Sequence, residues 1–342
     1  MADKFRVSID IGGTFTDLVY FKISPSGEKS IHIAKTDTTP SNFEQGIFNL
    51  IAKEQIDLSH VDYFCHGSTI IINALTEKKG AKTALITTHG FKDVLEIARG
   101  NRPDFFNLDY VKPPALVPRY LRKEVIGRMS YQGKELIPLD LSCLPTIIKE
   151  FEKEDVESIA VCLLNSYTNP SHEIAVVEEI KKLAPQIQCM GSYQISREWR
   201  EYERMSTVAF CSYVRPIAQK YLNNLDHKLA EKNYKNALFL MQSNCGVDTL
   251  SNSKETPITT VESGPASGMW AVQELSRLLG EKNLIGLDIG GTTAKCSLLK
   301  DGHIKINSDY YIDKNEKCAG YPLIIPVVDI LEIGFFSPKK TR

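Results

Sequence analysis

The stretch FRVSIDIGGTFTDLVYFKI, residues Phe5–Ile23, decides the fold of this chain. Apolar and polar side chains alternate before a Gly-Gly pair, and a second β-prone apolar run follows it, so we expect a strand, a tight turn and a strand. Asp10 lies where the first strand ends, and Thr14 and Thr16 follow the turn. Glycines let a backbone approach an anion closely, and peptide N–H groups and hydroxyls then donate to phosphate. A Gly-Gly hairpin without a ligand is an equally good interpretation of this stretch taken alone.

A second copy of the motif favours the phosphate interpretation. LIGLDIGGTTAKCSLL, residues Leu284–Leu299, repeats the residues DIGGT of the first copy between two apolar strands. Two identical glycine turns far apart indicate a duplicated domain, and two turns that face each other would grip a polyphosphate from both sides. The sequence contains neither a GxxxxGK[ST] loop nor a GxGxxG fingerprint at these turns, which excludes both of those nucleotide-binding modes.

Composition restricts the class of protein. The chain has 342 residues, enough for two or three domains. Its net charge of -1 gives no electrostatic support for binding to nucleic acid or to a membrane surface. Eight scattered cysteines without a CxxC pair argue against a zinc site and a disulfide framework. No apolar run approaches the length of a membrane span, and the N-terminus lacks the apolar core of a signal peptide, so we expect a cytoplasmic protein.

Between the two motifs, strand and helix patterns alternate, as is typical of an α/β fold. His66 in HGSTIIINAL lies at the end of an expected strand, where such folds place ligands. Arg99 and Arg102 belong to the loop RGNRPDFFNLDY, whose arginine forks and aromatic faces suit a carboxylate or a planar ring. For His66 alone an ordinary loop residue is the favoured alternative. The arginine loop is almost as well explained as a surface loop whose phenylalanines bury locally.

Two further stretches have a plain structural interpretation. QISREWREYER, residues Gln194–Arg204, is dense in charge and predicts the solvated start of a helix with Glu–Arg pairing. ESGPASG begins at Glu262 and leads into another helix. Ser263 and the glycines of this segment either line a ligand or allow tight packing of the helix on a strand.

Seven motifs occur in one order: DIGGTFTD, HGSTIIINAL, GNRPDFFNL, REYER, SNCGV, ESGPASG and DIGGTTAK. With them the chain resembles, from about Phe5 to about Gly334, the hydantoinase A family of ATP-dependent N-methylhydantoinases and 5-oxoprolinases, which includes acetone carboxylase subunits. The resemblance implies an α/β fold of the actin, sugar-kinase and chaperone ATPase superfamily, with two ribonuclease-H-like halves around an ATP cleft. We expect the N-terminal region with the first phosphate motif at 1–190, the rest of the first half and a connection at 191–283, and a partial second half at 284–342.

The resemblance also implies an activity. Family members use ATP and Mg²⁺ to phosphorylate the amide oxygen of a small cyclic amide, such as a hydantoin or 5-oxoproline, or a ketone oxygen, before hydrolysis or carboxylation. They commonly work with a hydantoinase B-type partner subunit, and we expect an oligomer. Asp10 and Asp288 are the expected catalytic carboxylates and hold Mg²⁺ through water. The expected phosphate-binding residues are Gly12, Gly13, Thr14, Thr16, Gly290, Gly291, Thr292, Thr293 and Lys295. The expected substrate residues are His66, Arg99 and Arg102.

The chain departs from the family pattern in three places. Cys245 replaces the first glycine of a pair, Leu331 replaces the histidine of a DIHEIGAGGGS-type motif, and residues 335–342 replace its glycine run. We therefore expect a C-terminally truncated chain with exposed strand edges and apolar faces. A catalytically inactive remnant that acts as a binding or partner subunit is the alternative function. A sugar or acyl kinase is a third hypothesis, against which the family-specific stretches argue.

Overall fold

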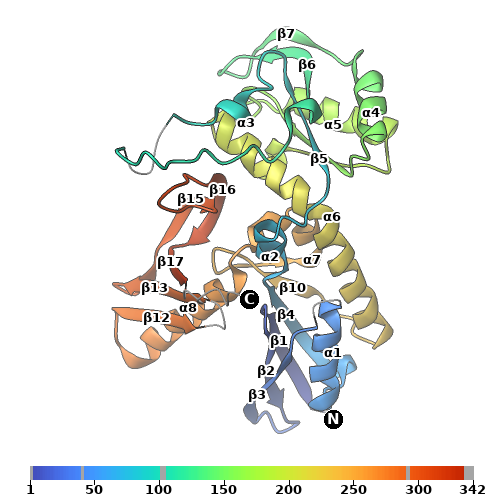
Figure 1. Cartoon of the computed structure of the whole chain (residues 1–342). Helices are drawn as coiled ribbons and strands as arrows, with labels where there is room; N and C mark the ends of the chain where they lie inside the picture. The colour runs from blue at the N-terminus through green and yellow to red at the C-terminus, as the bar shows by residue number, and fades with distance from the viewer. Residues whose placement is uncertain (1–2, 40–41, 101–104, 290–292, 335–342) are drawn as a thin grey trace, which may run out of the picture.

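The computed structural model describes residues 3–39, 42–100, 105–289 and 293–334. Its longest helix, α6 (Glu201–Glu231), runs from one α/β lobe down along a second, and a smaller lobe with the C-terminal strands lies beside them (Figure 1). Pro216 lies inside α6, which continues through it. In the described ranges, none of the helices combines the length and the apolar character that crossing a lipid bilayer requires.

The N-terminal lobe contains a six-stranded sheet of order β11-β10-β4-β1-β2-β3. Its strands are β1 (Lys4–Ile11), β2 (Phe15–Ile23), β3 (Lys29–Asp37), β4 (Val61–Ser68), β10 (Leu238–Met241) and β11 (Val247–Thr249). The expected hairpin is confirmed: β1 and β2 are antiparallel, and β4 lies parallel to β1 on its other side. The apolar side chains of β1 share one core with α1 (Phe43–Lys53) and the C-terminal part of α6. Asn42 is the N-cap of α1.

The second lobe contains a five-stranded sheet of order β7-β6-β5-β8-β9. Its strands are β5 (Thr83–Thr88), β6 (Arg122–Met129), β7 (Glu135–Asp140), β8 (Ser158–Cys162) and β9 (Gln188–Gly191). Its helices are α2 (Ile70–Thr76), α3 (Val94–Ile97), α4 (Leu144–Lys153) and α5 (Ser171–Leu183). Strands β5 and β8 are buried along their whole length, which explains their continuous apolar runs.

The smaller lobe contains the second copy of the motif. Strands β12 (Leu284–Ile289), β13 (Thr293–Lys300), β14 (His303–Ile304) and β17 (Ile330–Gly334) form one sheet, and β15 (Ile306–Ile312) pairs with β16 (Tyr321–Val328). Helix α8 (Ser263–Leu279) packs on one face of β12, where Gly286 allows the close approach of Met269. On the other face, aliphatic side chains of β12, β13 and β17 are exposed, which confirms the expected open apolar face.

The expectation of a solvated start for α6 is wrong. Glu203 and Arg204 are both buried, because the first turns of α6 lie between β8, α3 and β16. Arg204 donates to the Leu163 carbonyl at 2.6 Å, and Glu203 accepts both nitrogens of the Arg99 fork at 2.9 and 2.7 Å. Glu203 and Arg204 therefore bind neighbouring elements of the fold, whereas Arg197, Glu198 and Arg200 of the same stretch are exposed as expected.

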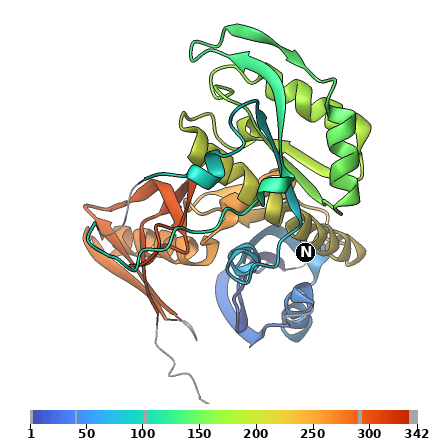
Figure 2. The ribbon, with the colours of Figure 1, turned by 45° about the horizontal axis from the view of Figure 1, so that its top comes forward.

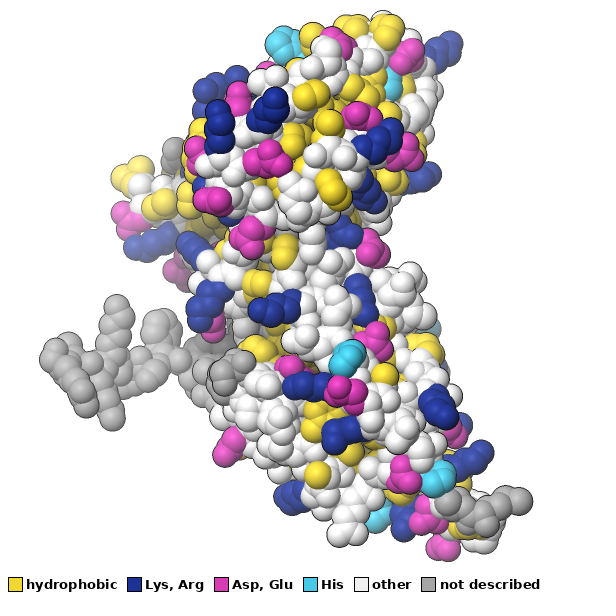
Figure 3. All heavy atoms as spheres, turned by 90° about the vertical axis from the view of Figure 1, so that its right-hand side faces the viewer, with side chains coloured by type: hydrophobic (Ala, Val, Ile, Leu, Met, Phe, Trp, Pro, Cys, Tyr) yellow, Lys and Arg dark blue, Asp and Glu magenta, His cyan; other side chains and the backbone are white. Residues whose placement is uncertain are grey.

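A long loop joins the second lobe to the smaller lobe. After α3 the chain crosses over to the β15–β16 hairpin, as Figure 2 shows. There the Val111 amide donates to the Lys317 carbonyl at 2.7 Å, and the Tyr321 hydroxyl donates to the Pro114 carbonyl at 2.7 Å. On the face seen in Figure 3, basic and acidic side chains are interspersed, in keeping with the small net charge.

Candidate functional site

Asp10 ends β1 at the centre of the candidate site. Its neighbour on β4 is Gly67, and a Cβ atom at Gly67 would lie 2.6 Å from Oδ1 of Asp10. A Cβ atom at Gly264, near the start of α8, would lie 3.2 Å from Oδ2 of the same carboxylate. Glycine at both places therefore lets two segments close around the carboxylate. In this position Oδ1 is buried and has no hydrogen-bond partner.

The protein environment disfavours ionisation of Asp10. Burial raises the pKa of its carboxyl to about 6, and the negative charges of Asp17 and Asp288 add to this effect. Asp17 is the cross-strand partner of Asp10 on β2, whereas Asp288 comes from the second hairpin. The two hairpins thus present their carboxylates to one another closely enough to interact electrostatically.

These carboxylates fit a hydrated cation. An orphaned buried oxygen and mutually repelling carboxylates are both stabilised when a divalent cation is bound nearby. Within the part of the chain that is described, no three histidine, cysteine or carboxylate side chains gather in a way that could hold a metal ion directly. Mg²⁺ keeps several of its waters and is bound through one or two carboxylates plus phosphate oxygens, which matches this donor set.

The first glycine turn is held by backbone and threonine contacts. The Gly12 amide donates to the Phe15 carbonyl at 2.9 Å, which closes the turn. The amide of Thr38 donates to the Thr14 carbonyl at 2.9 Å, and the Thr38 hydroxyl donates to the Gly12 carbonyl at 2.9 Å. Gly13 and Thr14 are exposed at the tip. The turn therefore has a fixed shape and an accessible tip, as a phosphate cradle requires.

Thr16 does not belong to this cradle, and the expectation for it is corrected. Its side chain is fully buried, and its Oγ1 lies against Gly46 of α1 and 3.4 Å from the Thr38 hydroxyl. Thr16 pairs with Ile11, so it occupies the face of the hairpin opposite to Asp10. Thr16, Leu18 and Tyr20 occupy every second position of β2 and share its buried face. This period of two was the sequence signal for the orientation of Thr16.

The second hairpin places Asp288 directly opposite Lys295. Asp288 is exposed, and Thr293 begins β13. Three expected phosphate-binding residues, Gly290, Gly291 and Thr292, lie outside the described residues. Lys295, the remaining one, forms an ion pair with Glu262 at the N-cap of α8.

The start of α8 supplies Glu262, which sequence reasoning did not select, and Ser263, for which it left two alternatives open. The Ser263 hydroxyl accepts from the Ser68 amide at 3.2 Å and lies 3.3 Å from the Ser68 carbonyl, which ties α8 to the end of β4. Glu262 binds Lys295 and also accepts from the Tyr310 hydroxyl at 3.2 Å. A carboxylate within the glycine-rich ESGPASG segment was the available signal, but nothing in the sequence indicated its partners.

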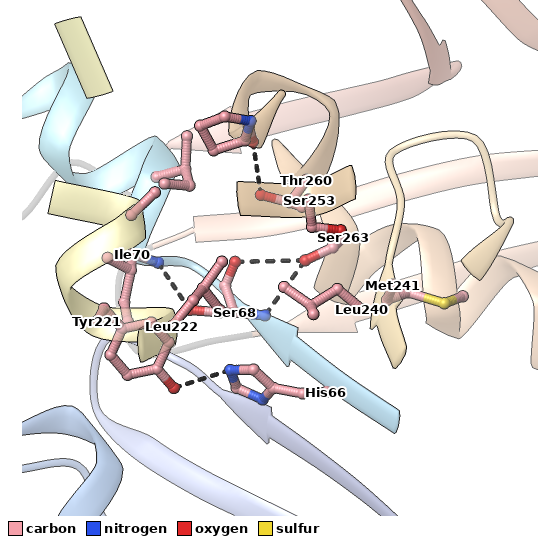
Figure 4. A pocket seen from close by; sticks show the side chains of 13 residues that line it. His66, Ser68, Ile70, Tyr221, Leu222, Leu240, Met241, Ser253, Thr260 and Ser263 are labelled. Carbon is pink, nitrogen blue, oxygen red and sulfur yellow. Dashed lines mark hydrogen bonds between the residues drawn. The ribbon is translucent and has the colours of Figure 1, made fainter. Parts of the chain in front are cut away.

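His66 is a buried structural residue. Its Nδ1 donates to the Ile9 carbonyl at 3.2 Å, so Nε2 accepts from the Tyr221 hydroxyl at 2.8 Å (Figure 4). Burial lowers the pKa of the imidazole to about 4, which keeps it neutral near pH 7. The adjoining cavity, lined also by Ser68 and Ser263, measures about 20 Å³, room for one water molecule and not for a cyclic amide.

The arginine loop is only partly described. The Arg99 guanidinium donates two hydrogen bonds to the Glu203 carboxylate, and Arg102 lies outside the described residues. Phe105 and Phe106 are 82% and 90% exposed, so the alternative that they bury locally is wrong. The loop is held instead by its hydrogen bonds to the β15–β16 hairpin, which leave these rings facing outward.

Comparison with known proteins gives consistent matches. The family described as hydantoinase/oxoprolinase N-terminal region matches residues 6–184, and the family described as hydantoinase/oxoprolinase matches residues 204–337. An uncharacterized protein of Methanocaldococcus jannaschii is 36% identical over 98% of this chain and 50% of its own length.

A relative of known sequence and a related crystal structure both carry the name of one enzyme, caprolactamase. The alpha subunit of caprolactamase from Pseudomonas jessenii is 29% identical over 97% of this chain and 48% of its own length. A crystal structure of ATP-dependent caprolactamase from that organism matches with a TM-score of 0.82 and 27% identity, over 96% of this chain and 48% of the other.

A nucleotide-free structure of acetone carboxylase matches with a TM-score of 0.83 and 25% identity, over 97% of this chain and 48% of the other. These matches confirm the α/β fold that the motifs predicted. The chain spans about half the length of the curated relatives it matches.

Proposed function

Because the chain belongs to the hydantoinase/oxoprolinase family, we propose that it carries the phosphate-binding part of an ATP-dependent enzyme that activates a small cyclic amide. The reaction is phosphorylation of the amide oxygen of a hydantoin, 5-oxoproline or lactam ring, followed by hydrolysis. Relatives named for caprolactam hydrolysis and for ATP-dependent acetone carboxylation support this general chemistry.

One observation carries the proposal: the DIGGT motif occurs twice, and the second copy lies near enough to the first for the negative charge of Asp288 to add to the raised pKa of the buried Asp10. We expect both copies of a duplicated phosphate motif to bind the same ligand. A chain of phosphates with its cation would meet the peptide N–H groups of the first glycine turn and would neutralise the carboxylates of Asp10 and Asp288.

The residues have distinct parts in this scheme. Asp10 and Asp288 hold Mg²⁺ through its water shell, and Gly12, Gly13 and Thr14 offer donors to phosphate oxygens. Phosphoryl transfer asks the protein mainly for positioning and for stabilisation of charge, and a rigid turn with an exposed tip provides both. ATP, when bound, supplies the phosphoryl group. We assign no substrate contact to His66, because both of its ring nitrogens are bound within the protein.

We also propose that the complete enzyme contains a second subunit. The caprolactamase relative is an alpha subunit. Two further relatives are the beta subunit of acetone carboxylase and the gamma subunit of acetophenone carboxylase. The exposed aliphatic face of the β12–β13–β17 sheet supports a need for further polypeptide, because water contact with such a face is unfavourable.

Isothermal titration of the purified chain with Mg²⁺–ATP tests the proposal. We expect micromolar binding that Asp10→Asn weakens at least about tenfold, since one carboxylate to the cation is lost. Asp155→Asn is the matched control, because Asp155 is exposed in the second lobe and its positive φ of 52° suits asparagine.

Either outcome is informative. Binding followed by ATP hydrolysis that 5-oxoproline, hydantoin or caprolactam stimulates would establish the activity and its substrate. A folded wild-type chain that binds no Mg²⁺–ATP would overturn the proposal and would favour the inactive remnant or partner subunit.

A further inference from the structure

We infer that Glu262 controls the charge of Lys295 in the phosphate cleft: its carboxylate aims the ammonium group toward the nucleotide phosphates and partly neutralises it. This inference rests on the proposed function, because it assumes that polyphosphate binds between the two hairpins. In this scheme Lys295 binds phosphate, and the negative charge of Glu262 weakens that binding.

The backbone at Glu262 indicates that the position is specialised. Glu262 has φ 59° and ψ 24°, in the left-handed region that non-glycine residues enter only at a cost in free energy. Glycine or asparagine would adopt this conformation more easily. Because the backbone conformation at this position does not favour glutamate, we attribute its presence to the contacts of its carboxylate with Lys295 and Tyr310.

The side chain makes two contacts that join separate strands. Glu262 is buried, one carboxylate oxygen pairs with the Lys295 ammonium from β13, and the other accepts from Tyr310 on β15 at 3.2 Å. A buried carboxylate is stable only when it is paired and hydrogen-bonded, and both conditions are met. Glu262 therefore fixes the place of Lys295 relative to α8 and β15.

Lys295 lies beside the candidate phosphate site. It is the cross-strand partner of Asp288, and both side chains border the hollow between β12, β13 and Pro265 of α8. One residue before Pro265, a Cβ atom at Gly264 would lie 3.2 Å from Oδ2 of Asp10. Glu262 is thus two residues from the glycine that lies near Asp10 of the first hairpin. Its partner Lys295 lies opposite Asp288 of the second hairpin.

The chemistry of an ammonium group allows shared binding. Lysine has three N–H donors, so Lys295 can keep Glu262 and still donate to a phosphate oxygen. The negative charge of Glu262 then works against phosphate, whereas the positive charge of Lys295 works for it. Removal of one charge or the other must change phosphate affinity in opposite directions.

This difference in sign separates the inference from a purely structural ion pair. We would measure Mg²⁺–ATP affinity by isothermal titration for Glu262→Gln and Lys295→Met in the full chain. Glutamine keeps one oxygen that accepts from Lys295 and can donate its NH2 to the Tyr310 hydroxyl oxygen, but it removes the negative charge, so we expect affinity to rise about threefold to tenfold. Lys295→Met should lower affinity about tenfold, and the double variant should bind close to Lys295→Met.

Stability is the internal control. Each single variant removes one charge of the partly buried ion pair, so both should lower the melting temperature, while the affinities change in opposite directions. Glu96→Gln, which breaks the pair with buried Arg122 in the second lobe, should leave Mg²⁺–ATP affinity unchanged.

The negative outcomes are distinguishable. The proposed function stands if the wild-type chain and Asp155→Asn bind Mg²⁺–ATP and Asp10→Asn does not. If in that case Glu262→Gln and Lys295→Met leave the affinity unchanged, or shift it in the same direction, this inference alone fails. If the folded wild-type chain binds no Mg²⁺–ATP, both the inference and the proposed function fail.

Discussion

The two DIGGT hairpins have the same motif but opposite surroundings. Asp10 and Asp288 take the same place in their strands, and the apolar residues that flank them alternate in the same way. The first hairpin buries these positions, with exposures of 1%, 2% and 0% for Val7, Ile9 and Ile11. The second exposes them, with 69%, 63% and 63% for Ile285, Leu287 and Ile289.

This difference shows that neighbouring elements, and not the motif, determine whether the flanking apolar side chains are buried. In the first hairpin α1 and α6 cover the apolar face, and Gly67 and Gly264 close around the carboxylate. In the second hairpin α8 covers only the face of Gly286, while the opposite face has no cover among the described residues. One carboxylate is therefore desolvated and the other remains in contact with water.

The largest expected effect compares equivalent core positions. Ile9→Ala should lower the free energy of unfolding by about 3 kcal/mol, because it opens a cavity in a packed core. Leu287→Ala should change it by about 0.5 kcal/mol or less, because that side chain is mostly exposed already. Urea denaturation of both variants tests this. Equal losses would mean that the second face is covered in solution.

The next effect concerns pH. Asp10 has a pKa of about 6 in the folded chain and an ordinary value of 3.8 when unfolded, so the folded state holds more protons between those values. Stability should therefore fall as the pH rises from about 4 to above 6, by up to about 3 kcal/mol, and then level off.

Asp10→Asn should remove this step, whereas Asp288→Asn should only reduce it, through the lost repulsion. Urea denaturation between pH 4 and pH 8 in a chelator is the measurement. A step of unchanged size in Asp10→Asn would show that another group causes it.

A smaller effect tests the closure around Asp10. Gly67→Ala places a Cβ atom 2.6 Å from Oδ1 of Asp10, which is too close, so we expect a loss of about 1–3 kcal/mol and weaker Mg²⁺–ATP binding. Gly13→Ala is the matched control for stability, since nothing lies within 4 Å of its Cβ position. Tolerance of alanine at Gly67 would contradict the close packing.

The smallest effect separates the two threonines of the first hairpin. Thr14→Val should leave stability within about 0.5 kcal/mol and weaken Mg²⁺–ATP binding, because its hydroxyl lies at the exposed tip. Thr16→Val should leave Mg²⁺–ATP affinity unchanged and alter stability by about 1 kcal/mol, because its hydroxyl lies in the core near Thr38. Titration calorimetry and thermal unfolding distinguish them, and reversed roles would contradict the register.

Much of the candidate site followed from local patterns. The glycine turns, the strands around them and Asp10 at a strand end are consequences of alternation and backbone freedom, which act over a few residues. The solvated start assigned to Glu203 and Arg204 failed because charge density says nothing about partners such as Arg99 and Leu163, which are distant in sequence.

By itself, the sequence determined two hairpins with identical glycine turns, an α/β fold and membership of the hydantoinase/oxoprolinase family. Only the tertiary structure decided which carboxylate is buried, that Thr16 packs in the core, and that Glu262 meets Lys295. Hairpin geometry depends on neighbouring residues along the chain, whereas desolvation and ion pairing depend on groups that long-range packing brings together.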